Sequence, residues 1–161
     1  MAVIYKKNLN KDRVMKLMVD ELTMYGEMVI KEAFETANFN KKKTQNLRDS
    51  YASAVFYEGK MINGTLRTLG SPLALVDKIW YGRKVRGRNE ATRFLRNDYK
   101  PTGRGLSLVA IAAMPYREVL ELKYKYRVIS GANWMMRSLA NTFSSKFGVR
   151  RNGITISNIE V

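Results

Sequence analysis

The side chains that could do chemistry in this chain are carboxylates, lysines and serines, because it contains neither histidine nor cysteine. A Ser–His–Asp triad, a cysteine–histidine pair and the usual zinc and haem ligands are therefore excluded. What remains is carboxylate–Mg²⁺ chemistry, a lysine nucleophile or a Ser–Lys pair.

None of these three chemistries has a recognisable pattern of residues. The carboxylates are scattered, without the short groupings that magnesium sites use. Glu118 and Glu121 are one turn apart on an expected helix, where solvated carboxylates are a simpler interpretation than a metal pair. Residues 82–87 lack the Lys-Ser/Thr pair that follows a phosphate-binding loop. We therefore expect no enzymatic activity, no metal and no cofactor, and a carboxylate-dependent nuclease is the weakest of the hypotheses considered.

Charge is the unusual feature of the composition. The 161 residues include 29 Lys and Arg against 14 Asp and Glu, so the net charge is +15 at pH 7. Residues 78–104 carry nine basic and two acidic residues, which is nearly half of this excess. Glycines and Pro101 interrupt this segment, so we expect a basic Gly/Arg-rich loop or insertion over residues 78–105, with at most a short helical turn at 90–96.

The basic segment points to an anionic partner. Its arginines alternate with Trp80, Tyr81, Phe94 and Tyr99, and such a mixture can hold single strands by stacking and charge. Arginine-rich loops can also follow duplex phosphates without reading sequence, or dock on an acidic protein. A solvated loop is the alternative without a partner. The residues expected to contact nucleic acid or an acidic partner are Arg83, Lys84, Arg86, Arg88, Arg93, Arg96, Lys100 and Arg104.

Periodicity predicts a long amphipathic helix over residues 11–37, with Asn10 as its N-cap. Apolar residues recur there at spacings of three and four, and charged residues fall mostly between them. We expect this stripe to face the core, with a contact between subunits as the alternative for its methionines. Its members are Val14, Leu17, Met18, Leu22, Tyr25, Met28, Val29 and Ala33.

A second amphipathic helix is predicted over residues 132–147, with Gly148 as its C-terminal glycine. The apolar residues expected on one side of it are Trp134, Met135, Leu139, Phe143 and Phe147. Shorter helices are predicted at 45–54 and 116–122.

Strands are predicted between these helices. Residues 55–57 and 61–62 flank Gly59 as a hairpin, and residues 65–69 follow as a further strand. The apolar run 106–113 is typical of a central strand buried on both faces. A short strand at 126–129 and a C-terminal strand or arm at 149–161 complete the expected elements.

These elements predict a single α+β domain over residues 1–161. Its long N-terminal helix and C-terminal helix pack on a small, mostly antiparallel β-sheet, and a long basic loop projects from it. No apolar run approaches the roughly 18 residues of a membrane span, and the N-terminus has no signal-peptide core. We therefore expect a soluble protein that is made in a cytoplasm and has no membrane partner.

Several short motifs occur in order along residues 11–147. A Thr-x-Asn-Leu-Arg-Asp-Ser segment follows the first helix, a Tyr-Glu-Gly-Lys turn comes next, and a Met-Pro-Tyr segment with a later glutamate precedes Val-Ile-Ser-Gly and the last helix. This order resembles the tail-completion or neck proteins of tailed bacteriophages. Two departures are Arg117, where alanine is usual, and the expanded basic segment. The residues that match the family motifs are Leu47, Arg48, Ser50, Pro115, Tyr116 and Glu121.

The resemblance implies a structural virion protein without catalysis. Proteins of this family form homo-oligomeric rings at the head–tail junction, between the portal and tail proteins and around the DNA channel. It also implies a location in the neck or tail of the virion, in the host cytoplasm during assembly. The positive charge of such a ring has two alternative partners: packaged double-stranded DNA, contacted without sequence specificity, or acidic surfaces of the portal or tail. The alternative is a non-specific nucleic-acid-binding protein that acts through residues 78–104.

Overall fold

A computed structural model of the protein describes residues 10–38, 45–70, 78–80, 82–114, 123 and 127–149. The helices are α1 (Lys11–Thr36), α2 (Gln45–Asp49), α3 (Gly87–Arg93) and α4 (Asn133–Phe147), with a π-helical turn at Phe94–Asp98 and a 3₁₀ turn at Ser130–Ala132. The strands are β1 (Tyr51–Tyr57), β2 (Lys60–Met61), β3 (Arg67–Thr68), β4 (Lys78–Trp80), β5 (Arg83–Val85) and β6 (Leu106–Ala112). The predicted α+β class is confirmed.

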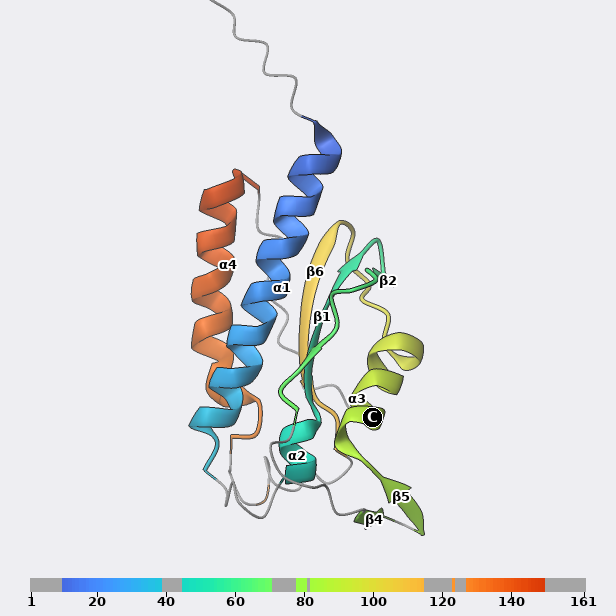
Figure 1. Cartoon of the computed structure of the whole chain (residues 1–161). Coiled ribbons are helices and arrows are strands. Elements are labelled where there is room, and N and C mark those ends of the chain that lie inside the picture. The colour runs from blue at the N-terminus through green and yellow to red at the C-terminus, as the bar shows by residue number, and fades with distance from the viewer. Residues whose placement is uncertain are drawn as a thin grey trace, which may run out of the picture.

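The elements form layers around one antiparallel sheet. Figure 1 shows α4 beside α1, with α1 against the sheet and α3 on the opposite side of the sheet. Strand β1 is the middle of the sheet, because β6 pairs along one edge and β2 and β3 pair along the other. The prediction that 106–113 is the central strand is therefore wrong in its position: among the described residues, β6 pairs with β1 alone.

Alternation along β1 distributes its side chains between two cores. Tyr51 and Val55 pack toward α1, whereas Ala52, Ala54 and Phe56 pack toward α3. Because helices cover both faces, six of the seven β1 residues are buried. This two-sided burial explains why the strand lacks the polar alternation of a half-exposed strand.

Helix α1 begins and buries its residues largely as its periodicity predicts. The Asn10 Oδ1 accepts hydrogen bonds from the backbone N–H groups of Asp12 at 3.1 Å and Arg13 at 3.3 Å, which confirms the N-cap. The buried stripe is narrower than predicted, because Leu17 is 53% exposed and Met28 is 41% exposed. Burial in the core therefore does not account for these two apolar side chains.

The predicted helix at 45–54 is wrong in its second half. Helix α2 ends at Asp49, where the Ser50 hydroxyl donates a 2.7 Å hydrogen bond to the Leu47 carbonyl oxygen. From Tyr51 onward the chain pairs residue by residue with β6, so long-range ladder bonds replace the helical ones. The hairpin around Gly59 is confirmed as β1 and β2, and the strand predicted at 65–69 shortens to β3.

The basic segment is not a long loop. Strands β4 and β5 pair as a hairpin, and α3 with the π-helical turn follows directly. The glycines misled the prediction, because Gly87 serves close packing and does not break the helix. A Cβ placed on Gly87 would lie 2.0 Å from the Asn46 carbonyl oxygen.

Helix α4 matches its prediction in extent, and Gly148 follows it with a φ of +64°. Of the residues predicted to share one side of this helix, Phe143 is buried, whereas Trp134 is 60% exposed. The strand predicted at 126–129 is also wrong at its described residues, since residues 128–129 form a turn. The predicted helix at 116–122 lies outside the described residues, as do positions 150–161 of the arm.

Candidate functional site

The segment of α3 and the π-helical turn carries three of the eight predicted contact residues, Arg88, Arg93 and Arg96, and its inward side anchors it on the sheet. Ala91, Phe94 and Leu95 are buried against Phe56 and Val109 of the sheet. Leu95 is fully buried. These apolar residues hold the basic segment on the sheet, so its charges sit on a fixed surface.

Two polar residues of α2 fix the start of α3. The Asn46 side chain accepts a hydrogen bond from Gly87 N–H at 3.0 Å and donates one to the Val85 carbonyl oxygen at 3.4 Å. The Asp49 carboxylate accepts one from Arg88 N–H at 3.0 Å. Asn46 and Asp49 are 4% and 3% exposed, so these bonds form in the interior. Sequence reasoning missed both residues, because nothing local links them to a segment about 40 positions away.

The exposed side chains of this helical segment and of the irregular residues after it, up to position 104, include five cations. Arg88, Arg93, Arg96, Lys100 and Arg104 are all exposed. Arg93 differs from the others, because its guanidinium lies 3.1 Å from the Glu90 carboxylate and 3.7 Å from the Asp98 carboxylate. The other four have no ion pair within the part of the chain that the structure describes. We call Arg88, Arg96, Lys100 and Arg104 the basic face.

The remaining predicted cations flank the basic face on β5 and the residue after it. Lys84 and Arg86 are exposed. Arg83 belongs to β5, and its side chain lies outside the described residues.

Two of the aromatic residues that could stack on bases instead pack against other rings of the protein. Phe94 is 7% exposed and stacks on Tyr99, with ring centroids 5.7 Å apart. The Tyr99 ring also meets Phe56 edge-on, at 5.9 Å between centroids. Phe94 is therefore a core residue, and Tyr99 is partly buried against the core. The Trp80 side chain and all of Tyr81 lie outside the described residues.

A second surface, on α1 and α4, is apolar. Leu17, Met24 and Met28 are 53%, 47% and 41% exposed, and their spacing of seven and four residues places them on one side of α1. We call these three residues the apolar stripe. Trp134 of α4 is also exposed.

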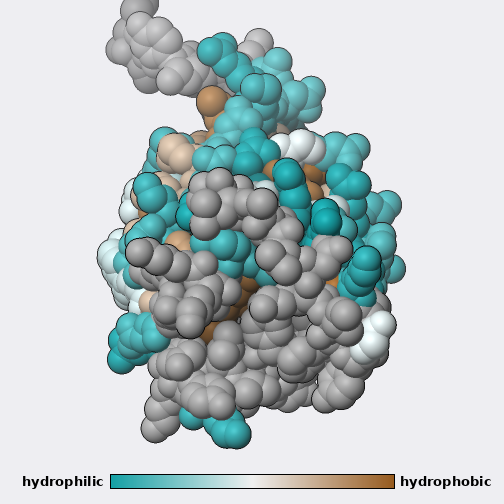
Figure 2. Space-filling model, turned by 60° about the horizontal axis from the view of Figure 1, so that its bottom comes forward, coloured by the Kyte–Doolittle hydropathy of each residue, from teal (hydrophilic) through white to brown (hydrophobic). Residues whose placement is uncertain are grey.

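In Figure 1 both α1 and α4 lie on the opposite side of the sheet from α3, so the apolar stripe and the basic face are separated by the sheet. Figure 2 shows another view, in which the described residues are mostly hydrophilic.

The family-motif residues that the structure describes lie at the junction of α2 and β1. Leu47 and Ser50 are fully buried, and the Arg48 guanidinium lies 5.0 Å from the centroid of the Phe34 ring. These positions serve packing and give no reactive arrangement. The other three motif residues, Pro115, Tyr116 and Glu121, lie outside the described residues.

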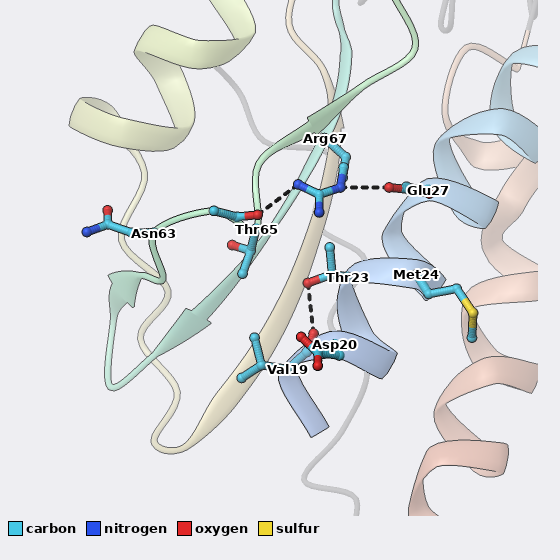
Figure 3. A pocket seen from close by; sticks show the side chains of 9 residues that line it. Val19, Asp20, Thr23, Met24, Glu27, Asn63, Thr65 and Arg67 are labelled. Carbon is cyan, nitrogen blue, oxygen red and sulfur yellow. Dashed lines mark hydrogen bonds and ion pairs between the residues drawn. The ribbon is translucent and has the colours of Figure 1, made fainter. Parts of the chain in front are cut away.

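A hollow of about 320 Å³ opens between α1 and the turn before β3. Figure 3 shows the Arg67 side chain directed across it to Glu27, and the two groups are 2.6 Å apart. The same guanidinium donates a 2.8 Å hydrogen bond to the Gly64 carbonyl oxygen, and Asp20 pairs with Lys16 at 3.1 Å. The charged side chains that line the hollow are therefore all in ion pairs, Glu27 with Arg67 and Asp20 with Lys16 outside the lining. The described residues also hold no cluster of carboxylates that could bind a metal ion, and none of their helices is long and apolar enough to cross a membrane.

A polar contact between α1 and α4 perturbs two pKa values. A hydrogen bond from Lys146, whose Nζ lies 2.7 Å from the Glu21 carboxylate, lowers the pKa of Glu21 below its usual value, and Tyr25 contributes. Burial and its hydrogen bond with Glu21 raise the pKa of Tyr25 to about 12. The Tyr25 ring packs edge-on against Phe143, at 6.4 Å between centroids. The contact holds α4 on α1 and is structural.

The raised pKa of Tyr25 predicts a loss of stability at high pH. Because the folded state favours the neutral phenol, its contribution is complete below pH 10 and is lost as the pH rises toward 12. We expect the free energy of unfolding, measured by urea titration, to fall by about 1 to 2 kcal/mol between pH 9 and 11.5. The Tyr25→Phe variant should not show this decrease. Equal pH dependence in the two proteins would contradict this assignment.

Searches with models of protein families, among curated proteins and among solved structures give no match for this chain.

Proposed function

We propose that this protein is a structural subunit of a ring at the head–tail junction of a tailed bacteriophage, where it connects portal and tail around the DNA channel. The observation that carries the proposal is the separation of two unlike surfaces by one sheet. A ring subunit at this junction needs surfaces that bind neighbouring proteins and a surface that can lie beside the negatively charged DNA. The apolar stripe suits the first role, and the basic face suits the second.

The resemblance to neck proteins adds support. The elements have the expected order, from a long N-terminal helix through a small antiparallel sheet to a C-terminal helix on α1. The Leu-Arg-x-Ser motif residues lie at one structural junction, where Leu47 and Ser50 are fully buried. The chemistry of the described site agrees with a role in assembly, because its charged groups form ion pairs or point to solvent.

Assembly with a portal tests the proposal directly. The mass of the purified protein is measured alone and after mixing with a phage portal, and virions made without the protein are imaged by electron microscopy. We expect a ring-sized assembly on the portal, and heads without attached tails when the protein is missing. A protein that never joins a portal, together with normal tailed virions in its absence, would refute the proposal.

The apolar stripe gives a sharper test of the protein contacts. We expect Met24→Glu with Met28→Glu to reduce assembly at least tenfold, because two carboxylates would have to be buried in the contact. The control is Asn63→Glu with Thr102→Glu, which adds the same charge at exposed positions elsewhere. Sedimentation velocity measures assembly, and circular dichroism verifies folding. If both double variants assembled equally well, the apolar stripe would not be part of the interface.

A second candidate function, a free nucleic-acid-binding protein, is favoured by the basic face alone. The two candidates differ in their partners, because a free DNA-binding protein would bind DNA without joining a portal.

A further inference from the structure

We propose that the basic face binds the phosphate backbone of duplex DNA without reading its sequence. Arg88, Arg96 and Lys100 make the contact, and Arg104 extends it. Arg93 instead stabilises the helical segment through its ion pairs with Glu90 and Asp98. The surface belongs to the single chain, so this inference does not depend on ring formation.

The first argument is the availability of the charges. Residues 84–104 carry seven basic and two acidic residues, and both acidic residues pair with Arg93. Two further carboxylates lie beside this stretch, because Asp49 accepts a hydrogen bond from the Arg88 N–H at 3.0 Å and Glu58 accepts one from the Gly105 N–H at 2.7 Å. Among the described residues, neither forms an ion pair with a side chain of the basic face, so its four cations stay exposed. Exposed unpaired cations attract polyanions over distances comparable to the Debye length, which is about 10 Å at 0.1 M salt.

The second argument is the rigidity of the support. The helix that carries Arg88 and Arg96 is fixed at its start by Asn46 and Asp49 and held underneath by Leu95. Cations on a packed helix lose less conformational freedom on binding than cations on a loop. Arg88 and Arg96 therefore lie on a preformed helical surface, and Lys100 and Arg104 follow it in irregular structure.

The third argument separates a nucleic acid from an acidic protein. Stable protein interfaces are built around buried apolar or aromatic anchors. Among the described residues, the large apolar side chains that are exposed are Leu17, Met24, Met28, Tyr57 and Trp134, none of which belongs to α3 or the π-helical turn. The exposed chain neighbours of Arg88 and Arg96 are polar instead and include Asn89 and Asn97, whereas the exposed Tyr57 pairs with Leu106 near the Arg104 end. Arginine, lysine and asparagine are typical contacts to DNA phosphates.

The fourth argument favours duplex over single-stranded DNA. Single-strand binding depends on aromatic side chains on which bases can stack. Phe94 is 7% exposed, and Tyr99 is partly buried with its ring against Phe94 and Phe56, so neither ring offers an open face to a base. What the described surface offers is charge, and charge is sufficient to bind the regular phosphates of a duplex.

The test compares two variants that lose the same charge at different places. Fluorescence anisotropy measures binding of a labelled 20-base-pair duplex from 50 to 300 mM salt. Arg88→Gln with Arg96→Gln removes half of the basic face, and Arg13→Gln with Lys31→Gln removes two exposed charges from α1. We expect the first variant to bind at least tenfold more weakly at 50 mM salt, with a logarithmic salt slope smaller by roughly two, and the second to change less than threefold.

Three outcomes would overturn the inference. The first is that the unmodified protein does not bind the duplex at 50 mM salt. The second is equal weakening by the two variants, which would indicate net charge without a defined surface. The third is binding to polyglutamate or to a 20-base single strand at least as tight as to the duplex. Circular dichroism of each variant verifies its fold, and portal assembly is measured separately, so failure of this inference and failure of the ring proposal are distinguishable.

Discussion

Gly87→Ala is expected to destabilise the protein by about 3 kcal/mol or more, because the first residue of α3 has no room for a side chain. An added Cβ would lie 2.0 Å from the Asn46 carbonyl oxygen and 2.6 Å from the Ser50 backbone nitrogen. Both neighbours are backbone atoms of the α2–β1 junction, so they cannot rotate away as the end of a long side chain could. Relief of the clash requires separation of α3 from α2, which would break the hydrogen bonds that Asn46 and Asp49 make to α3.

Gly103→Ala is the matched control for this prediction. A Cβ added at Gly103 would have the Ser107 Oγ as its nearest neighbour, at an ordinary van der Waals distance of 3.9 Å. The φ of Gly103 is not positive, so alanine can adopt the same backbone conformation. We expect its free energy of unfolding, measured by urea titration, to change by less than about 0.5 kcal/mol. If Gly87→Ala proved equally harmless, the close approach of α2 and α3 would be wrong. Since α3 carries the basic face, Gly87→Ala should also weaken duplex binding under conditions in which the protein remains folded.

Tyr51→Ala is expected to cost about 4 kcal/mol, since a fully buried aromatic ring would leave a large cavity. The ring meets Phe34 of α1 edge-on, with 5.8 Å between centroids, and its hydroxyl donates a hydrogen bond to the Val128 carbonyl oxygen. One side chain thereby joins β1, α1 and the turn that precedes α4. Loss of the ring should loosen all three elements at once.

Tyr51→Phe separates the hydrogen bond from the packing. The phenylalanine keeps the ring but leaves the Val128 carbonyl oxygen without this donor in the interior, so we expect a cost of about 1 to 2 kcal/mol. Urea titration of both variants gives the two contributions. A Phe variant as unstable as the Ala variant would indicate that the hydroxyl matters more than the ring, which would contradict the packing described here.

The elements that the sequence predicts well are those governed by neighbouring residues. Helix α1 has an apolar period and a capping Asn10, and α4 ends before Gly148 in the left-handed conformation. The hairpin of β1 and β2 turns at Gly59 with a φ of +76°. Each of these signals lies within a few positions of the structure it specifies, because helix periodicity, caps and tight turns are local effects.

The basic segment shows where local signals are insufficient. Its glycines and charges predict a loop, yet burial of Leu95 and Phe94 against β1 and β6 stabilises a helix there. The bonds that fix this helix connect residues 39 to 41 positions apart, such as Gly87 with Asn46. Partners at this separation leave no periodic trace in the sequence, so it predicted only the short helical turn at 90–96 and none of its anchors.

The sequence by itself determined the charge, the lack of histidine and cysteine, the α+β class and the two long helices. These follow from composition and from spacings within single elements. Only the tertiary structure decided which cations are paired, which aromatic rings are buried, and that the apolar stripe and the basic face lie on opposite sides of one sheet. The physical reason is that ion pairing and burial depend on contacts between distant segments. Arg93 and Arg96 are equivalent in the sequence, but the fold places two carboxylates beside Arg93 and directs Arg96 to solvent.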